Sequence, residues 1–254
     1  MTSPQTQHWN PERYGENARF VSDLGMPVVE LLSPQPGERI LDLGCGDGML
    51  SLKLVDIGCK VVGVDSSAEM IKAAKSLGLD AYVMDGQSLS FESEFNAVFS
   101  NAALHWMKGP KQVIDGVWRA LRPGARFVGE FGGYGNVASI VTALESALSM
   151  RSVTISSPWY FPRLEEYRKL LEARGFEVRT IDLIPRPTIL PGDVSSWLET
   201  FAQYYTSALP VKERLVFIAE VADALRNVLC DANGKWQVDY VRLRFSAIKP
   251  LTVT

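Results

Sequence analysis

Cysteine and histidine are scarce in this sequence, which has three cysteines and two histidines among its 254 residues. The cysteine count is odd and the spacings match no metal motif, so we expect no disulfide framework and no metal site, but free thiols in the reducing cytoplasm. The first ten residues lack the apolar core of a signal peptide. Long apolar runs are also missing, which argues against a membrane partner.

Positive charge is not in excess either, because the formal net charge is −3. Nucleic-acid-binding domains usually carry a basic stripe, so we expect no nucleic-acid partner. The main local basic cluster consists of Arg119, Arg122 and Arg126, and we expect it to be solvated surface. Hydrophobic residues make up 46% of the chain, which is enough to build a core without covalent staples.

The pattern of apolar residues predicts short strands that alternate with helices. Strands are expected at 39–43, 60–64, 81–84, 95–100 and 126–131, and the intervening helices end at glycines or at a Pro-Gly pair. Such alternation is typical of an α/β fold with a parallel sheet and helices on both faces.

The second half of the chain is less regular. It predicts helices at 136–150, 163–174, 194–207 and 211–229, and strands at 176–184 and 237–248. We interpret residues 1–254 as a single domain in which about 193–230 form a helical insertion before the last strand. We expect this insertion to cover the active site.

The segment from Ile40 to Gly48 carries the strongest motif, because it places three glycines where a predicted strand ends and a helix begins. Glycines there permit a tight turn and close approach of the backbone to a ligand. The free N–H groups of the following helix suit a carboxylate. The spacing is G-x-G-x-G, not the G-x-G-x-x-G of dinucleotide-binding enzymes.

Polar residues follow the next three predicted strands. Asp65 ends the second strand, where a carboxylate either accepts hydrogen bonds from ribose hydroxyls or only caps the next helix. Asp85 ends the third strand, and Asn101 begins the loop after the fourth. Ligands of open α/β sheets bind outside the carboxyl ends of the strands, so these residues predict one shared site.

Taken together, the motifs resemble the class I S-adenosylmethionine (SAM)-dependent methyltransferases over residues 36–132. The resemblance implies a Rossmann-like sheet of seven mostly parallel strands with an antiparallel last strand, and SAM as the cofactor. Trp9-Asn10-Pro11, Asn101 to Trp106 and Trp159 to Pro162 resemble, more narrowly, the trans-aconitate methyltransferase-like group that acts on small molecules.

The resemblance also implies contacts to each part of the cofactor. The first motif lines the methionine part, Asp65 binds the ribose, the neighbouring residues and those after the third strand meet the adenine, and the N-terminal helix folds over the site. The expected cofactor-binding residues are Tyr14, Asp42, Gly44, Cys45, Gly46, Asp65, Ser66, Met70, Asp85, Gly86, Gln87, Asn101 and Ala102.

The methyl acceptor should lie beside the fourth and fifth strands. His105 is the candidate base or orienting group, with simple packing as the alternative. Trp106 is expected to form a pocket wall. Glu130 either faces the acceptor or pairs with an arginine, and Tyr134 belongs to the aromatic residues available to a substrate cavity. We expect a small acceptor with an oxygen nucleophile such as a carboxylate, and an arginine such as Arg163 could bind it.

Other functions remain open at this point. A nicotinamide-dependent oxidoreductase would need the other glycine spacing. A nucleic-acid methyltransferase commonly has an Asn/Asp-Pro-Pro-aromatic motif after the fourth strand, where this chain has Asn101-Ala102-Ala103-Leu104. A SAM-binding protein without turnover is not excluded, because methyl transfer needs no diagnostic catalytic residue. Nothing in the sequence compels cyclopropane synthesis, and the oligomeric state is not predicted.

Overall fold

The computed structural model describes residues 7, 9–11 and 24–251. The expected cofactor contact at Tyr14 therefore lies outside the described residues. The chain forms two compact units that each combine three chain segments. Unit 1 consists of Met1–Ala18, Gly135–Pro158 and Pro185–Val241, and unit 2 consists of Arg19–Tyr134, Trp159–Ile184 and Arg242–Thr254.

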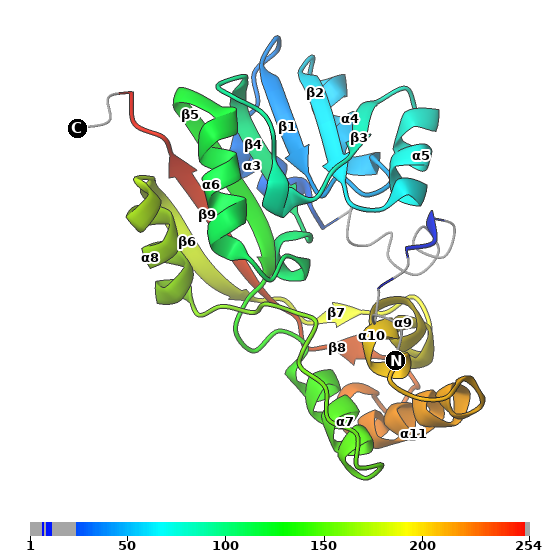
Figure 1. Cartoon of the computed structure of the whole chain (residues 1–254). Helices are drawn as coiled ribbons and strands as arrows, with labels where there is room; N and C mark the ends of the chain where they lie inside the picture. The colour runs from blue at the N-terminus through cyan, green and yellow to red at the C-terminus, as the bar shows by residue number, and fades with distance from the viewer. Residues whose placement is uncertain (1–6, 8, 12–23, 252–254) are drawn as a thin grey trace. The chain divides into compact units, whose positions relative to one another are not determined.

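Unit 2 is built on one seven-stranded sheet (Figure 1). Its strands are β1 (Arg39–Leu43), β2 (Lys60–Asp65), β3 (Asp80–Val83), β4 (Phe95–Asn101), β5 (Leu121–Gly132), β6 (Glu177–Pro185) and β9 (Val241–Ile248). Its helices are α3 (Met26–Leu32), α4 (Met49–Asp56), α5 (Ala68–Ser76), α6 (Pro110–Ala120), α8 (Leu164–Arg174) and the short 3-10 helices η1 (Gly86–Ser88) and η2 (Leu104–Trp106).

The strand order in this sheet is β3-β2-β1-β4-β5-β9-β6. Strands β1 to β5 pair in parallel, whereas β9 pairs antiparallel with β5, with Glu130 opposite Arg244. We call the edge where β1 to β5 end the carboxyl edge, and the edge where they begin the amino edge. The expected Rossmann-like α/β sheet with an antiparallel last strand is confirmed.

Alternating side chains of the strands feed two separate cores. Ile40 packs with residues of α3 and α4 on one face, while Leu41 and Leu43 pack with residues of α6 and α8 on the other. Figure 1 shows α6 in front of the sheet and α3 and α4 behind it. Because each face is covered by helices, the parallel strands are apolar on both sides.

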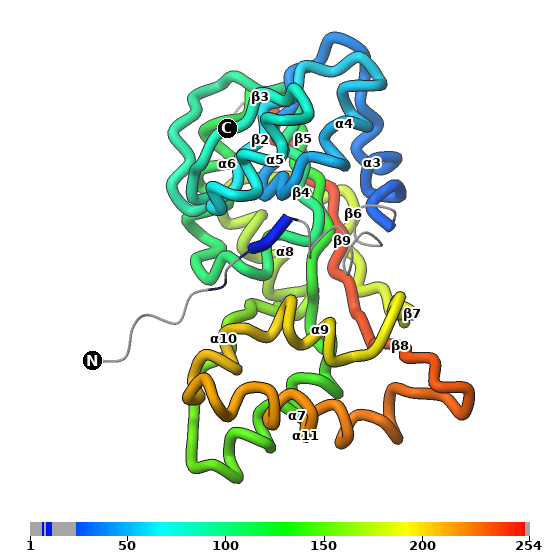
Figure 2. Tube along the Cα trace, turned by 90° about the vertical axis from the view of Figure 1, so that its right-hand side faces the viewer, coloured from blue at the N-terminus to red at the C-terminus, as the bar shows by residue number. Residues whose placement is uncertain are grey.

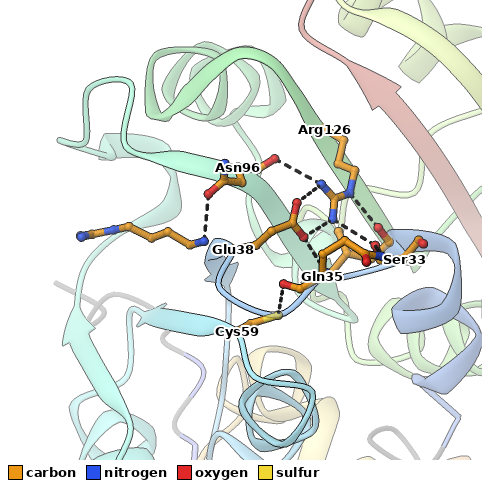
Figure 3. Close-up of polar contacts among 8 residues, drawn as sticks. Ser33, Gln35, Glu38, Cys59, Asn96 and Arg126 are labelled. Atoms are coloured by element: carbon orange, nitrogen blue, oxygen red, sulfur yellow. Dashed lines mark hydrogen bonds and ion pairs between the residues drawn. The ribbon is translucent and has the colours of Figure 1, made fainter.

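The amino edge is closed by a polar cluster (Figure 3). The Arg126 guanidinium donates to both carboxylate oxygens of Glu38 at 2.8 and 2.6 Å. Its other N–H groups donate to the carbonyl oxygens of Leu32, Ser33 and Asn96. The expectation of a solvated surface is therefore wrong for Arg126, since this side chain ties the end of α3 to the starts of β1, β4 and β5.

Unit 1 is mainly helical. It contains α7 (Ala138–Ser149), α9 (Val194–Phe201), α10 (Gln203–Thr206), α11 (Val211–Leu229) and a small antiparallel pair of strands, β7 (Thr188–Ile189) and β8 (Gln237–Val238). Figure 2 shows α7 and α11 side by side. The helices expected before the last strand are present.

The last predicted strand differs from the expectation, because 237–248 is two strands. Residues 237–238 pair with β7, and residues from 242 onward pair with β5. At the break, Asp239 accepts hydrogen bonds from the backbone and hydroxyl of Ser139, and Val241 donates to the Asn136 side chain. These contacts hold the chain where it leaves the two-stranded sheet and enters the seven-stranded one.

Candidate functional site

The glycine-rich turn after β1 takes backbone conformations that L side chains disfavour. Gly44 and Gly46 have φ of +78° and +55°, and the N–H groups of Gly44 and Cys45 both donate to the Val64 carbonyl at 2.8 and 3.0 Å. A Cβ on Gly44 would lie 2.2 Å from the Ala103 Cβ, whereas one on Gly46 would meet no atom of the described residues within 4 Å. The turn therefore packs against the loop after β4 at Gly44, and none of the described residues fills the space at Gly46.

Cys45 and Asp65 join this turn to the end of β2. The Cys45 side chain packs so closely on β2 that a Cβ on Gly63 would lie 2.8 Å from its Sγ. Burial raises the pKa of the Cys45 thiol, which makes it a poor nucleophile. The Asp65 carboxylate accepts hydrogen bonds from Gly46 N–H at 3.1 Å and Ser67 N–H at 2.9 Å. The N-cap of α5 is Ser67 and not Asp65, so Asp65 joins the glycine turn to the residue that caps the helix.

Asp42 lies beneath the turn, in the sheet. Its side chain is 2% exposed, and the Ser51 hydroxyl of α4 donates to its carboxylate at 2.5 Å. Burial raises the pKa of Asp42 to about 7, against the lowering effect of the Ser51 hydrogen bond, and the nearby Asp65 raises it further. A carboxyl group held this way orients the start of α4. When ionised, it contributes negative charge although it is hardly exposed to solvent.

The residues after β3 pack against the loop that follows β4. Asp85 caps η1, because its Oδ1 accepts the Gln87 N–H at 2.9 Å. Gln87 accepts the Gly109 N–H at 2.7 Å. A Cβ on Gly86 would lie 2.7 Å from the Met107 Sδ, so the segment is packed against the loop after β4.

The two remaining adenine candidates lie on the turn into α5. Ser66 is exposed, whereas Met70 is buried and its N–H is capped by Ser67 Oγ at 3.2 Å.

Strand β4 is anchored to its neighbours at the carboxyl edge. The buried Ser100 hydroxyl donates to the Leu43 carbonyl at 2.7 Å, and Ala102 N–H donates to the Glu130 carbonyl at 2.7 Å. Ala102 has φ of +56°, a conformation that costs a non-glycine residue about 1–2 kcal/mol. Asn101 lies opposite Glu130 in the sheet. This edge thus places Asn101 and Ala102 between the ends of β1 and β5.

His105 is buried on η2, with 7% of its surface exposed. Its Nδ1 accepts the Gly132 N–H at 3.3 Å, and its carbonyl accepts the Tyr160 N–H at 2.8 Å. Burial, followed by the positive charge of Arg242, holds the pKa of His105 well below its usual value. The imidazole is therefore neutral near pH 7, and its Nδ1 is engaged as an acceptor.

Trp106 belongs to an aromatic cluster that sequence reasoning found only in part. Its ring meets Trp159 edge-on at 5.8 Å, Trp159 stacks on Phe161 at 5.7 Å, and Phe161 lies 5.8 Å from the His105 ring. The segment around Trp159 to Phe161 therefore fixes the loop after β4, and the role of Trp106 as a pocket wall stays a prediction. The run of aromatic residues at 159–161 was the available signal for Phe161.

Glu130 and Arg244 form an ion pair across β5 and β9. Glu130 is 1% exposed, and Arg244 Nε and its terminal N–H donate to Glu130 Oε2 at 2.7 and 2.6 Å. The structure therefore favours pairing over contact with an acceptor for Glu130. Two residues away, Arg242 is also buried at 4% exposed and lies opposite Gly132. The antiparallel direction of β9 places its arginines at the carboxyl edge.

Tyr134 is 51% exposed, and the Arg163 guanidinium lies over its ring at 3.6 Å. This pair marks the outer end of β5 in unit 2. A groove of about 540 Å³ lies between α7 and α11, and none of its lining residues was predicted as a site residue.

In residues 7, 9–11 and 24–251, no group of three or more His, Cys, Asp or Glu side chains is arranged to hold a metal ion. Within the same ranges, every helix is too short or too polar to cross a lipid bilayer.

Comparison with known proteins bears directly on this carboxyl edge. Residues 41–129 match the family described as "Methyltransferase domain". The chain is 42% identical, over 95% of its length and 98% of the relative, to a Schizosaccharomyces pombe protein named as an uncharacterized methyltransferase. The chain belongs to the SAM-dependent methyltransferases.

Two further relatives extend this comparison. The methyltransferase is 34% identical to a trans-aconitate 2-methyltransferase of Rhodococcus jostii, over 47% of this chain and 51% of that protein. Its fold matches phosphoethanolamine N-methyltransferase 2 of Haemonchus contortus, solved with S-adenosylhomocysteine and phosphomonomethylethanolamine. That match has a TM-score of 0.58 at 19% identity and covers 90% of this chain and 53% of that one.

SAM is the cofactor of the methyltransferase, and the carboxyl edge fits it chemically. The space at Gly46, which no described residue fills, lies beside the Asp65 carboxylate, a suitable acceptor for ribose hydroxyls. SAM is cationic at its sulfonium and ammonium groups, and Asp42, Asp65 and Asp85 place negative charge at the ends of β1, β2 and β3. Asp42 and Asp65 are close enough for Asp65 to raise the pKa of Asp42.

Proposed function

We propose that this methyltransferase transfers the methyl group of SAM to a carboxylate oxygen of a small molecule. The observation that carries the proposal is a difference in charge along the carboxyl edge. The ends of β1 to β3 carry Asp42, Asp65 and Asp85, whereas the start of β9 carries Arg242 and Arg244. Such an arrangement suits a cationic cofactor on one side and an anionic acceptor on the other.

Two neighbouring groups feel these charges in addition to burial. Burial raises the pKa of Asp42, and the nearby Asp65 raises it further. Burial lowers the pKa of His105, and Arg242 lowers it further. Glu130 and Arg244 neutralise each other as an ion pair, so the positive charge on this side is that of Arg242. A buried guanidinium such as that of Arg242 is well suited to bidentate binding of a carboxylate.

The residues of this chain then have separate tasks. The glycine turn and Asp65 would bind the cofactor, with Asp42 orienting the start of α4 beneath them. When bound, SAM supplies the methyl group on a sulfonium, so that an acceptor oxygen lone pair forms the new C–O bond as the C–S bond breaks and its electron pair goes to sulfur. Trp106 and the aromatic cluster would exclude water from that reaction.

The proposal extends to the whole chain. The family match lies entirely within unit 2, and we propose that residues 1–254 act as one methyltransferase domain with a helical insertion at about 193–230. The described cysteines, Cys45, Cys59 and Cys230, are all free thiols, which supports a cytoplasmic location. The similarity to a trans-aconitate 2-methyltransferase supports a small carboxylic acid over nucleic acid.

The test is a screen of small carboxylic acids, phenols, amines and nucleic acids in which release of S-adenosylhomocysteine is measured. We expect turnover with at least one di- or tricarboxylic acid. Arg242→Met should raise KM for that acid by at least tenfold, while Arg179→Met, at an exposed ion pair on β6, should leave it unchanged. Turnover confined to amines, phenols or nucleic acid would contradict the proposal.

A further inference from the structure

The hydrogen bonding of His105 fixes where its imidazole carries a proton. Gly132 N–H points at Nδ1 at 3.3 Å, and a backbone N–H can only donate. Nδ1 must therefore present a lone pair, and a neutral imidazole then carries its single proton on Nε2. The ring cannot turn over freely, because Trp106 and Phe161 lie against it at 5.4 and 5.8 Å between ring centres.

The surroundings of the ring keep it neutral. Arg242 on β9 opposes protonation, and burial opposes it more strongly. Of the acidic groups on the adjoining elements, Glu130 on β5 is paired with Arg244, and Glu166 on α8 accepts the Tyr160 hydroxyl at 2.9 Å. Among the described residues, the only hydrogen bond of the imidazole is the one that Nδ1 accepts.

We propose that His105 is a fixed hydrogen-bond donor that selects acceptors by their charge state, and that it does not act as a general base. Its Nε2–H would bind an acceptor oxygen beside Arg242. This inference rests on the proposed carboxylate acceptor. It restricts the acceptors to molecules whose reacting oxygen is already ionised when they bind. Methyl transfer to a carboxylate releases no proton, so the reaction balances without a base. A phenol or alcohol would have to lose a proton, and His105 would have no lone pair to receive it.

The first experiment needs no acceptor. The sequence has only two histidines, His8 and His105, so a His8→Gln variant labelled with 15N at histidine gives the signals of one imidazole. We expect the Nε2–H tautomer and no titration between pH 5.5 and pH 8.5. An Nδ1–H tautomer, or protonation within that range, would overturn the proposal. This result is independent of whether the acceptor is a carboxylate.

The second experiment uses two variants with the best carboxylic acid from the screen. His105→Asn keeps an oxygen near Nδ1 to accept the Gly132 N–H but lacks the distal donor, whereas His105→Gln keeps an N–H near Nε2. We expect KM for the acid to rise at least tenfold in His105→Asn and clearly less in His105→Gln. The pH profile of wild-type kcat should be flat from pH 6 to pH 9.

Each other outcome counts against the donor role. A bell-shaped wild-type profile whose acidic limb disappears in both variants would assign a base to His105. If both variants lose the same amount of activity and of melting temperature while KM does not change, His105 has only a packing role. If the screen finds no carboxylic acid, the proposed function fails, and the NMR result still decides the tautomer.

Discussion

The two edges of the sheet in unit 2 treat their polar and charged groups in opposite ways. At the amino edge, the N–H groups of Arg126 are all directed to acceptors within the protein, and its partner Glu38 has a lowered pKa because of the Arg126 hydrogen bond. At the carboxyl edge, Asp42 is held with a raised pKa, Ala102 with a positive φ, and His105 in its neutral form.

The difference teaches where this fold gains stability and where it gives some up. Complementary charges at the amino edge favour the folded state over a chain in water. The strained or desolvated groups at the carboxyl edge disfavour it, and such groups concentrate where a protein binds ligands or carries out chemistry. The five predictions below test this comparison, from the largest expected effect to the smallest.

Arg126→Met should lower the free energy of unfolding by about 2–4 kcal/mol, because it leaves the half-buried Glu38 carboxylate and three carbonyl groups without their donor. Urea unfolding measures this loss. Arg122→Met, at an exposed position in the same basic cluster, is the control and should change the value by less than about 0.5 kcal/mol. SAM affinity of the folded Arg126→Met variant should stay at the wild-type value.

The polar cluster of Arg126 and Glu38 also predicts that the free energy of unfolding depends on pH. The folded-state pKa of Glu38 is lowered from 4.5, so its contribution to stability is complete above that pH and is lost as pH falls through the folded-state value. Glu38→Gln should remove this part of the acid sensitivity. If wild type and Glu38→Gln lose the same stability below pH 4.5, the ion pair of Glu38 and Arg126 does not stabilise the amino edge.

Asp65→Asn should weaken SAM binding by about 1–3 kcal/mol, which corresponds to roughly 5- to 150-fold in Kd, because an amide replaces the carboxylate proposed to accept the ribose hydroxyls. Isothermal titration calorimetry gives this value directly. Asp80→Asn, at an exposed carboxylate that begins β3, is the matched control. Unchanged affinity in Asp65→Asn would leave Asp65 only as an acceptor for the N–H groups of Gly46 and Ser67.

Asp42→Asn should raise the free energy of unfolding at pH 8 by about 1–2 kcal/mol, since it removes a buried charge and keeps an acceptor for Ser51. A raised folded-state pKa means that the folded protein binds more protons than the unfolded chain between about pH 4 and pH 7. Wild-type stability should therefore contain a term that decreases as pH rises through this window.

Urea unfolding of Asp42→Asn at pH 4 and pH 8 should lack that decrease. Ser51→Ala serves as the control, because it removes the hydrogen bond that favours the charged carboxyl group and should make the decrease larger. A variant that is less stable than wild type at pH 8 would show that the carboxyl edge carries no such cost at Asp42.

Ala102→Gly should change stability by less than about 1 kcal/mol and in the stabilising direction, because glycine adopts a φ of +56° without strain but loses more entropy on folding. Ala103→Gly is the comparison, since Ala103 has φ of −115° and packs on Gly44. It should be destabilising by about 0.5–1 kcal/mol. Differential scanning calorimetry can separate the two signs.

Much of the cofactor side was predictable because its signals are local. The glycine turn, Asp65 and Asp85 each follow a strand whose apolar residues are contiguous in sequence, and parallel strands bring such ends together. Roles that depend on distant partners were not predictable. The Ser51 bond to Asp42 joins a helix to a strand, and the Asp239 break in the last strand depends on α7.

The acceptor side depended on pairings between residues far apart in the chain. Glu130 and Arg244 are 114 positions apart, so sequence alone left Glu130 between two roles. His105 was recognisable as a candidate, but its tautomer follows from Gly132, which lies on β5, 27 positions further along the chain. Arg126 was misassigned for the same reason, because its partner Glu38 is 88 positions away.

The position of β9 has a consequence for biosynthesis. In the sheet, β9 lies between β5 and β6, although it follows both of them in the chain. During synthesis β6 leaves the ribosome before β9. Strand β6 cannot join the sheet until residues 241–248 have also emerged. Until then β5 exposes an unpaired strand edge, and such edges invite aggregation. Translation speed and chaperone supply over the segment from β6 to β9 should therefore affect the yield of folded protein.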